Sequence, residues 1–284
     1  MKDAPEAVDV LQQAAALNRE DALRQGSQLL FPNYGQLVMT GDLHGHRRNF
    51  KKLQQFCNLE QFGARHVMLH ELIHEEIETL DDYDTSHRLL LDAARWKCSF
   101  PDQVHFLLSN HELAQVNRHE ISKNGRVVTA DFEEGVAQDY GIGADKVLQA
   151  ICMLILSYPV AGRTANRVFL AHSLPSPLML PAFDPRVLAR ELTPEDLSDR
   201  GSAHMMVWGR YHTPAALSTL AELLDVDFFI CGHQPQDGGY GVIDDRMIIL
   251  ASEHNHGVFL PFDLGKPVVV EKMVAAIRPF AGVT

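Results

Sequence analysis

Five apolar segments of this chain each end in polar side chains that can bind a metal ion. The segments predict short strands, and the amphipathic stretches 49–62 and 87–100 between the first three predict helices. Strands that alternate with helices favour an α/β fold, in which ligands bind beyond the carboxyl ends of the strands. The polar residues after the predicted strands are, in chain order, Asp42 and His44; His70, Glu71 and His74; Asn110 and His111; His172; and His233.

These side chains are carboxylates, imidazoles and one amide, and no thiolate is among them. Such ligands suit Mn, Fe or Zn in a reactive centre rather than a structural zinc site built from cysteines. Two neighbouring ions need a carboxylate that bridges them, and paired ions clamp the attacking and leaving oxygens of a phosphoryl displacement. The four cysteines form no C-x-x-C pair and have apolar neighbours, so we expect buried free thiols.

The formal net charge of the 284 residues is −12. We therefore expect no nucleic-acid partner, because a phosphate backbone would be repelled. No stretch approaches the roughly 20 apolar residues of a membrane span, and the acidic N-terminal segment lacks the apolar centre of a signal peptide. We expect a cytoplasmic protein without a membrane partner. If it handles a phosphorylated ligand, metal ions are the simplest source of local positive charge.

The N-terminal residues 1–30 have apolar side chains near helical spacing and predict helix. We accordingly expect an N-terminal helical extension at 1–35, followed by a single domain at 36–284. The proline- and charge-rich stretch 176–206 is expected to belong to that domain, because neither a flexible linker nor a low-complexity tract separates it.

Residues 70–74 read HELIH and fit the H-E-x-x-H pattern of zinc peptidases. In those enzymes two histidines on one helical face bind zinc and the glutamate acts as base. Here the pattern follows directly on a predicted strand, and the next predicted helix, 87–100, contains no glutamate that could serve as third ligand. A zinc peptidase is therefore kept only as a remote alternative.

Four further blocks occur in the order of the signature of calcineurin-like metallophosphoesterases. They resemble its GDxHG, its GNHE and its two later histidine blocks: GDLHGH at 41–46, SNHE at 109–112, FLAHS at 169–173 and FFICGHQPQDGGY at 228–240. The resemblance covers roughly 36–265 and is closest to the phosphoprotein phosphatase branch, whose Ser/Thr phosphatases have a segment similar to 99–112. It implies a four-layer α/β sandwich of two mixed β-sheets flanked by helices, and a metal-dependent phosphatase.

The resemblance also implies a role for each matched position. The cofactors would be two metal ions, Mn, Fe or Zn. The implied ligands are Asp42 and His44 for the first ion, Asn110, His172 and His233 for the second, and Glu71 as the bridge. A metal-bound hydroxide would attack a phosphomonoester, and His111 would protonate the leaving group as general acid. The substrate would be a phosphorylated small molecule or a phosphoprotein.

The segment that contains HELIH departs from the family pattern GDxVDRG. His74 replaces an aspartate that orients and charges the catalytic histidine, and Glu75 replaces an arginine that helps to bind phosphate. These changes leave open a catalytically weakened relative that binds metal or a phosphorylated ligand. Positive charge can come from Arg48 or Arg210, and we expect Arg210 to bind phosphate. His74, Arg48 and His254 are expected beside the site without an assigned role.

Overall fold

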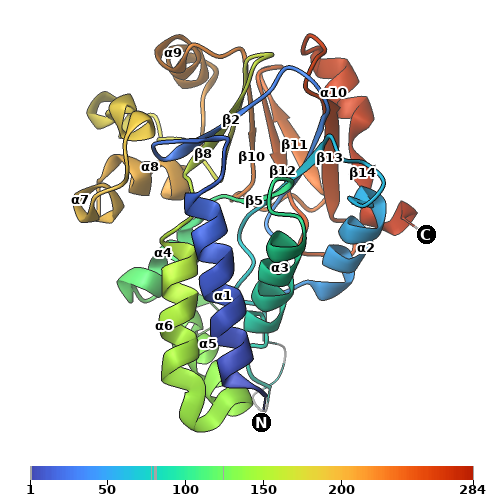
Figure 1. Ribbon diagram of the computed structural model, residues 1–284. Coiled ribbons are helices and arrows are strands. Elements are labelled where there is room, and N and C mark those ends of the chain that lie inside the picture. Colours follow the sequence, from blue (N-terminus) through green and yellow to red (C-terminus); the bar gives the residue numbers. More distant parts are fainter. Residues whose placement is uncertain (1, 78, 80–81, 124, 284) are drawn as a thin grey trace.

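Two mixed β-sheets lie face to face in the structure, a computed structural model that describes residues 2–77, 79, 82–123 and 125–283 (Figure 1). The larger sheet contains, in spatial order, β1 (Arg24–Gln25), β2 (Gln28–Phe31), β8 (Ala161–Thr164), β9 (Val168–Ala171), β10 (Phe228–Cys231), β12 (Met247–Leu250) and β11 (Tyr240–Ile243). The smaller sheet contains β14 (Arg278–Pro279), β13 (Val258–Asp263), β3 (Gln36–Thr40), β4 (Arg65–Leu69) and β5 (Val104–Phe106). A separate two-stranded ribbon is formed by β6 (Ser122–Lys123) and β7 (Arg126–Val127).

The parallel strands of both sheets end at the same edge of the sandwich. In the smaller sheet β3, β4 and β5 are parallel, and in the larger sheet β9, β10 and β12 are parallel. An isolated parallel bridge between Asp42 and Ala251 joins the carboxyl ends of β3 and β12 across the two sheets. The loops that follow these strands therefore meet at one edge, as ligand-binding loops of α/β sheets do.

The apolar core between the sheets is built from alternate residues of facing strands. Leu37 and Met39 of β3 point toward Leu170 of β9 and Ile230 of β10, and all four are almost fully buried. Phe229, between two inward residues of β10, belongs instead to the core beneath the helices. Because both faces of each sheet are covered, the strands read as continuous apolar runs rather than as an alternating pattern.

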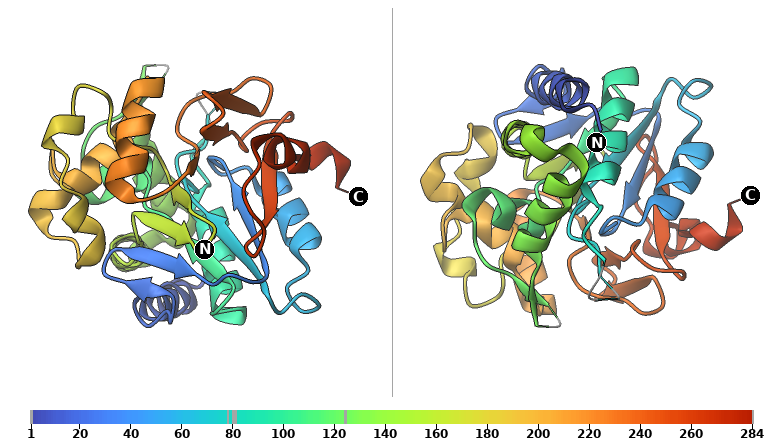
Figure 2. Two further views of the ribbon diagram at one scale, coloured as in Figure 1. Left: turned by 90° about the horizontal axis from the view of Figure 1, so that it is seen from above. Right: turned by 90° about the horizontal axis from the view of Figure 1, so that it is seen from below.

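Helices flank the two sheets, which confirms the predicted four-layer sandwich. They are α1 (Ala4–Arg19), α2 (Arg47–Cys57), α3 (His87–Ser99), α4 (Asn110–Asn117), α5 (Val128–Tyr140), α6 (Ala144–Ile155), α7 (Pro194–Leu197), α8 (Ser202–Trp208), α9 (Pro214–Leu224) and α10 (Val270–Ala276). Helix α1 packs against α3 and α6. In both views of Figure 2, the helices of 194–224 lie on one side of the molecule, and α2 and the C-terminal segment lie on the other.

The predicted helix over residues 1–30 is wrong beyond its first part. Helix α1 ends at Arg19, and Gln28–Phe31 form β2, which pairs in parallel with β8. In β2, Leu29 and Phe31 are buried while the residues between them are half-buried, a two-residue period that the preceding helical pattern obscured. The strands expected before each polar cluster, from β3 to β10, are confirmed.

All four cysteines lie within the described residues and are free, as expected, but Cys98 and Cys152 are half-buried rather than buried. Cys57 and Cys231 are buried in the core, and burial raises the pKa of the Cys57 thiol to about 12. Within the described part of the chain, the helices are too short or too polar to cross a bilayer.

Candidate metal centre

The loops after β3, β4 and β10 hold four polar residues in the left-handed backbone region. The φ angles are 39° for His44, 50° for Glu71, 63° for His74 and 68° for His233. Residues other than glycine rarely adopt this conformation, and such strain is concentrated at functional sites where the surrounding structure enforces it. The backbone is therefore strained at the residues whose side chains turn inward.

The HELIH segment, residues 70–74, has no regular secondary structure. The positive φ angles of Glu71 and His74 are incompatible with a helix. His70 and His74 consequently do not share a helical face, which removes the geometric basis of the zinc peptidase alternative. The segment is fixed to its surroundings by two side chains: Glu112 accepts a hydrogen bond from the Leu72 amide at 2.7 Å, and Ser86 accepts one from the His74 amide at 2.9 Å.

Glu71 is the centre of the predicted ligand set. Its carboxylate is 1% exposed and has three imidazole Nε2 atoms around it. His172 Nε2 lies 3.3 Å and His44 Nε2 lies 4.0 Å from Oε2, while His111 Nε2 lies 3.8 Å from Oε1. Glu71 Oε1 is buried without a hydrogen-bond partner among the described residues. A carboxylate in this position can bridge two ions.

On one side of Glu71, four ligand atoms are close together. His172 Nε2 lies 2.7 Å from Asn110 Oδ1, 3.1 Å from His233 Nδ1 and 3.3 Å from Glu71 Oε2. Atoms that bind one ion at about 2.1 Å are separated by about 3.0–3.4 Å. The 3.1 and 3.3 Å spacings fit a shared cation, and the 2.7 Å spacing to Asn110 is slightly shorter. His44, Glu71 and His111 form a second group whose ligand atoms lie within 4.8 Å of one another. The donor set fits a metal centre.

Asp42 adjoins the first of these groups. It is 7% exposed, and its Oδ1 lies 3.7 Å from His172 Nδ1 and 3.6 Å from His70 Nδ1. The structure thus brings together Asp42, His44, Glu71, Asn110, His172 and His233, the six residues expected to be metal ligands.

Negative charge accumulates at the centre. Burial and the nearby charges of Asp42 and Glu112 raise the pKa of Glu71 well above its usual range. Burial also raises the pKa of Glu112 to about 8. The pKa of Glu253 is raised by burial and by Asp42. A divalent cation would relieve the mutual repulsion of these carboxylates, which is the electrostatic condition that a metal site creates.

His172 and His233 are held in the neutral form. Burial, followed by the nearby His233, lowers the pKa of His172 well below its usual range. Burial and then the positive charge of Arg210 lower the pKa of His233 to about 3. Neutral imidazoles are the form that binds metal ions.

The other predicted residues have diverse positions. Arg210 is half-buried and close enough to His233 to influence its pKa, whereas Arg48 is exposed at the start of α2. His254 Nε2 contacts the Gln236 carbonyl oxygen at 3.0 Å, and His254 Nδ1 accepts a hydrogen bond from the His256 amide at 3.1 Å. Both ring nitrogens of His254 are thus engaged in contacts with backbone groups of nearby loops. Glu75 is tied to the backbone, since its carboxylate accepts a hydrogen bond from the Thr85 amide.

Sequence reasoning missed three residues that contact or adjoin the centre. His70 was named among the polar residues after the second predicted strand but given no role, yet its Nδ1 lies 2.9 Å from His172 Nδ1. Glu112 joins α4 to the HELIH segment, and Glu253 adds charge beside Asp42. The sequence signals were HELIH for His70 and SNHE for Glu112; no comparable signal marked Glu253.

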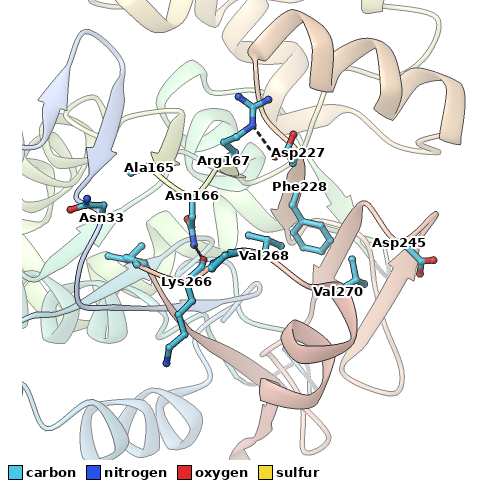
Figure 3. A pocket seen from close by; sticks show the side chains of 13 residues that line it. Asn33, Ala165, Asn166, Arg167, Asp227, Phe228, Asp245, Lys266, Val268 and Val270 are labelled. Atoms are coloured by element: carbon cyan, nitrogen blue, oxygen red, sulfur yellow. Dashed lines mark hydrogen bonds and ion pairs between the residues drawn. The ribbon is translucent and has the colours of Figure 1, made fainter.

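A hollow of the described surface lies away from these residues. This cavity of about 520 Å³ is lined by residues before β9, β10 and β12, at the edge opposite their carboxyl ends (Figure 3). Arg167, which lines it, forms an ion pair with Asp227 at 2.8 Å, and Lys266 forms one with Asp263 at 2.8 Å. Both of its basic side chains are thus paired with carboxylates, and its described residues include no counterpart to the ligand set.

The chain has the fold of solved phosphatase structures. A protein serine/threonine phosphatase from Saccharomyces cerevisiae with similarity to human phosphatase PP5 superposes with a TM-score of 0.70 at 13% identity, over 99% of this chain and 94% of that one. A cold-active protein tyrosine phosphatase of a psychrophilic Shewanella has a TM-score of 0.60 at 14% identity, over 89% and 80%. No protein-family model and no curated protein sequence matches the chain. The chain therefore shares the fold of these phosphatases.

Proposed function

We propose that the protein is a metal-dependent phosphatase that hydrolyses a phosphomonoester, either a phosphorylated small molecule or a phosphoprotein. The observation that carries the proposal is the arrangement around Glu71, where Asn110, His172 and His233 lie on one side and His44 approaches from the other. The fold shared with the two phosphatases supports the same reaction class.

The fitting cofactors are two ions, Mn, Fe or Zn. Asp42 and His44 would hold the first ion, Asn110, His172 and His233 the second, and Glu71 both. When bound, such ions bind phosphate oxygens and supply hydroxide near neutral pH. The protein would hold its histidine ligands in the neutral form and its carboxylate ligands in the anionic form, in a rigid and mostly buried arrangement.

His111 is proposed as general acid. Its Nε2 faces Glu71 at 3.8 Å, and its ring packs edge-to-face on His44 with a centroid distance of 4.8 Å. The ring is therefore next to the ligand set and can deliver a proton to the departing oxygen. General acid catalysis by a positioned histidine contributes about 10²–10⁴ in rate.

Arg210 is proposed to bind the substrate phosphate. It is half-buried, and its charge acts on His233, so its guanidinium can reach a phosphate held beside that histidine. Arg47, which also follows the first loop, is already paired with Asp92 at 2.6 Å, while Arg48 is exposed and remains a second phosphate contact to test.

A specific observation favours a second candidate, a relative that binds metal or a phosphorylated ligand without efficient turnover. His74, not a carboxylate, lies against His111, with 2.9 Å between the two Nδ1 atoms. Burial lowers the pKa of His74 to about 4, so at neutral pH it offers no negative charge to stabilise a protonated His111. Slow turnover is the expected consequence.

The test is hydrolysis of p-nitrophenyl phosphate by protein reconstituted with manganese, against a chelator-treated sample and the Asp42→Ala variant. Turnover that needs both metal and Asp42 is the expected result. Turnover that survives chelator or the substitution would contradict the metal mechanism. Metal binding without turnover by any common divalent ion would favour the binding protein.

The His111→Asn variant separates chemistry from metal binding. It should lower kcat by about 10²-fold or more and leave the bound metal unchanged. His119→Asn is the matched control, because His119 lies beyond the C-terminus of α4 and outside the ligand set. A His111 variant as active as the control would exclude the general-acid role.

A further inference from the structure

Three histidines of the centre contact the HELIH segment through Nδ1 and turn Nε2 toward Glu71 of the same segment. His172 Nδ1 lies 2.9 Å from His70 Nδ1, His111 Nδ1 lies 2.9 Å from His74 Nδ1, and His44 Nδ1 lies 3.0 Å from the Ile73 carbonyl oxygen. The three corresponding Nε2 atoms lie 3.3–4.0 Å from the Glu71 carboxylate. Residues 70–74 thus contact each of the three rings at Nδ1, and the Glu71 carboxylate of the same segment lies near each Nε2.

The contact between His70 and His172 has a defined direction. His70 Nε2 lies 2.8 Å from the Thr40 carbonyl oxygen, which can only accept, so Nε2 carries the proton. A neutral imidazole with a proton on Nε2 has only a lone pair on Nδ1. His70 therefore accepts from His172 Nδ1–H. His172 Nε2 faces two acceptor oxygens, Asn110 Oδ1 at 2.7 Å and Glu71 Oε2 at 3.3 Å, so it presents a lone pair to them when a metal ion lies between these atoms.

The contact between His74 and His111 is directed in the same way from a different acceptor. His74 Nε2 lies 2.9 Å from Gln115 Oε1, and Gln115 Nε2 donates to Glu133 Oε1 at 3.3 Å. The carboxylate of Glu133 fixes the amide orientation, because it can bind the amide nitrogen but not the amide oxygen. His74 thus donates through Nε2 and accepts from His111 Nδ1–H, so Nε2 is the His111 nitrogen that must take up the proton before it can act as general acid.

His44 needs no intermediate side chain. The Ile73 carbonyl accepts from His44 Nδ1–H at 3.0 Å, so His44 Nε2 also presents a lone pair to the centre. The positive φ angles of Glu71 and His74 give residues 70–74 a non-helical path, which leaves the Ile73 carbonyl free of the hydrogen bond that a helix would give it.

We propose that residues 70–74 set the tautomers of His44, His111 and His172, with His70 and His74 as positioning residues. The two histidines of HELIH then bind no zinc themselves: His70 accepts a hydrogen bond from His172 and His74 accepts one from His111, while Glu71 remains the proposed metal bridge. Outer groups that orient metal-binding histidines in this way typically contribute about 10- to 100-fold to metal affinity. The inference rests on the proposed phosphatase function for its purpose, but its geometry can be tested without turnover.

The experiment is a long-range ¹H–¹⁵N NMR spectrum of histidine-labelled, zinc-loaded protein, which distinguishes Nδ1–H from Nε2–H imidazoles. Signals are assigned by single histidine substitutions. The expected pattern is Nδ1–H for His44, His111 and His172 and Nε2–H for His70 and His74. Nε2–H forms of His111 and His172 would overturn the proposal.

The Gln115→Leu variant tests the causal step at a residue outside the ligand set. Removing the acceptor oxygen should move His111 toward a mixture of tautomers, whereas His172, whose contact chain ends at the Thr40 carbonyl, should keep Nδ1–H. Gln115→Glu restores an acceptor oxygen and should restore the His111 signal. An unchanged His111 signal in a folded Gln115→Leu protein would contradict the role of His74.

Metal affinity gives a second measurement. His70→Asn should weaken zinc binding by about 10- to 100-fold in calorimetric titration, without abolishing it. Unchanged zinc affinity would overturn the role of His70. If the NMR pattern holds and p-nitrophenyl phosphate is not hydrolysed, the proposed function fails while the orienting role stands; the opposite pair of results reverses that conclusion.

Discussion

The His233 backbone amide donates hydrogen bonds to both carboxylate oxygens of Asp42, at 2.9 and 3.0 Å, across 191 residues of sequence. The contact is possible because Gly232 has no side chain. A Cβ atom at Gly232 would lie 2.3 Å from Asp42 Oδ1 and 2.4 Å from His70 Cε1. The loop after β10 and the loop after β3 are thus locked at one backbone position.

Gly232→Ala should therefore displace Asp42 and His70 together. We expect loss of metal binding and a fall in the free energy of unfolding of about 1–3 kcal/mol from overpacking. Gly238→Ala, in the same loop, is the matched control, since no atom lies within 4 Å of its added Cβ. Urea unfolding and metal content of the purified proteins measure both effects. Equal behaviour of the two variants would contradict the close approach.

Metal ions should stabilise the folded protein, because they bind the native ligand set and relieve the repulsion among its carboxylates. At a free concentration of about 100 times the dissociation constant, a single ion adds about 2.7 kcal/mol. Thermal unfolding with manganese and with chelator measures the difference. In Asp42→Asn most of the increase should disappear; if it persists in full, the ion that stabilises the fold binds elsewhere.

Glu71→Gln should change stability and metal binding in opposite directions. The pKa of Glu71 is raised, so the native carboxyl resists ionisation, and the free energy of unfolding of the metal-free protein falls as pH rises above the unfolded value near 4.5. Removing this group should make the metal-free protein more stable at pH 7 by about 1–3 kcal/mol. Zinc affinity should drop strongly, whereas a peptidase base could be replaced with zinc still bound. Calorimetric titration with zinc measures the expected loss of affinity, and urea unfolding with chelator measures the expected gain in stability.

The part of the site that follows strand ends could be predicted from the sequence. Apolar runs mark β3, β5, β9 and β10, and Asp42, Asn110, His172 and His233 come within four residues of their ends, so topology alone brings them to one edge. The resemblance to a family then supplied an order and a role for each residue.

The orienting contacts could not be predicted in this way. His70 contacts Thr40 and His172, which are 30 and 102 residues away, and the contact depends on the direction of a side chain in a loop without regular structure. Gln115 lies within α4 and carries no pattern of its own. Strand β2 was missed for a related reason, because its pairing with β8 determines its conformation more than its short sequence does.

A buried polar cluster at the opposite ends of β4 and β5 gives a prediction on acid stability. Lys97 Nζ lies 3.1 Å and His105 Nδ1 lies 2.9 Å from Asp21 Oδ2, and His66 Nδ1 lies 3.1 Å from His105 Nε2. Burial, followed by the nearby His105, lowers the pKa of His66 to about 4. The folded state therefore keeps His66 neutral at pH values where the unfolded chain protonates it.

The sign follows from proton binding. Between pH 6.5 and about 4 the unfolded chain binds a proton at residue 66 that the folded chain does not, so the free energy of unfolding falls as pH decreases through this window. Between pH 7 and pH 5, the titration of His66 should lower the free energy of unfolding by about 1–2 kcal/mol.

His66→Gln keeps a polar side chain beside His105 but does not titrate, so its loss of stability from pH 7 to pH 5 should be smaller by that amount. Urea unfolding in chelator, which excludes any contribution from metal release, measures the difference, with exposed His256→Gln as control for the loss of a histidine. If His66→Gln loses as much stability as the unmodified protein over this interval, the acid sensitivity arises from other buried histidines, such as His87, whose pKa burial also lowers to about 4.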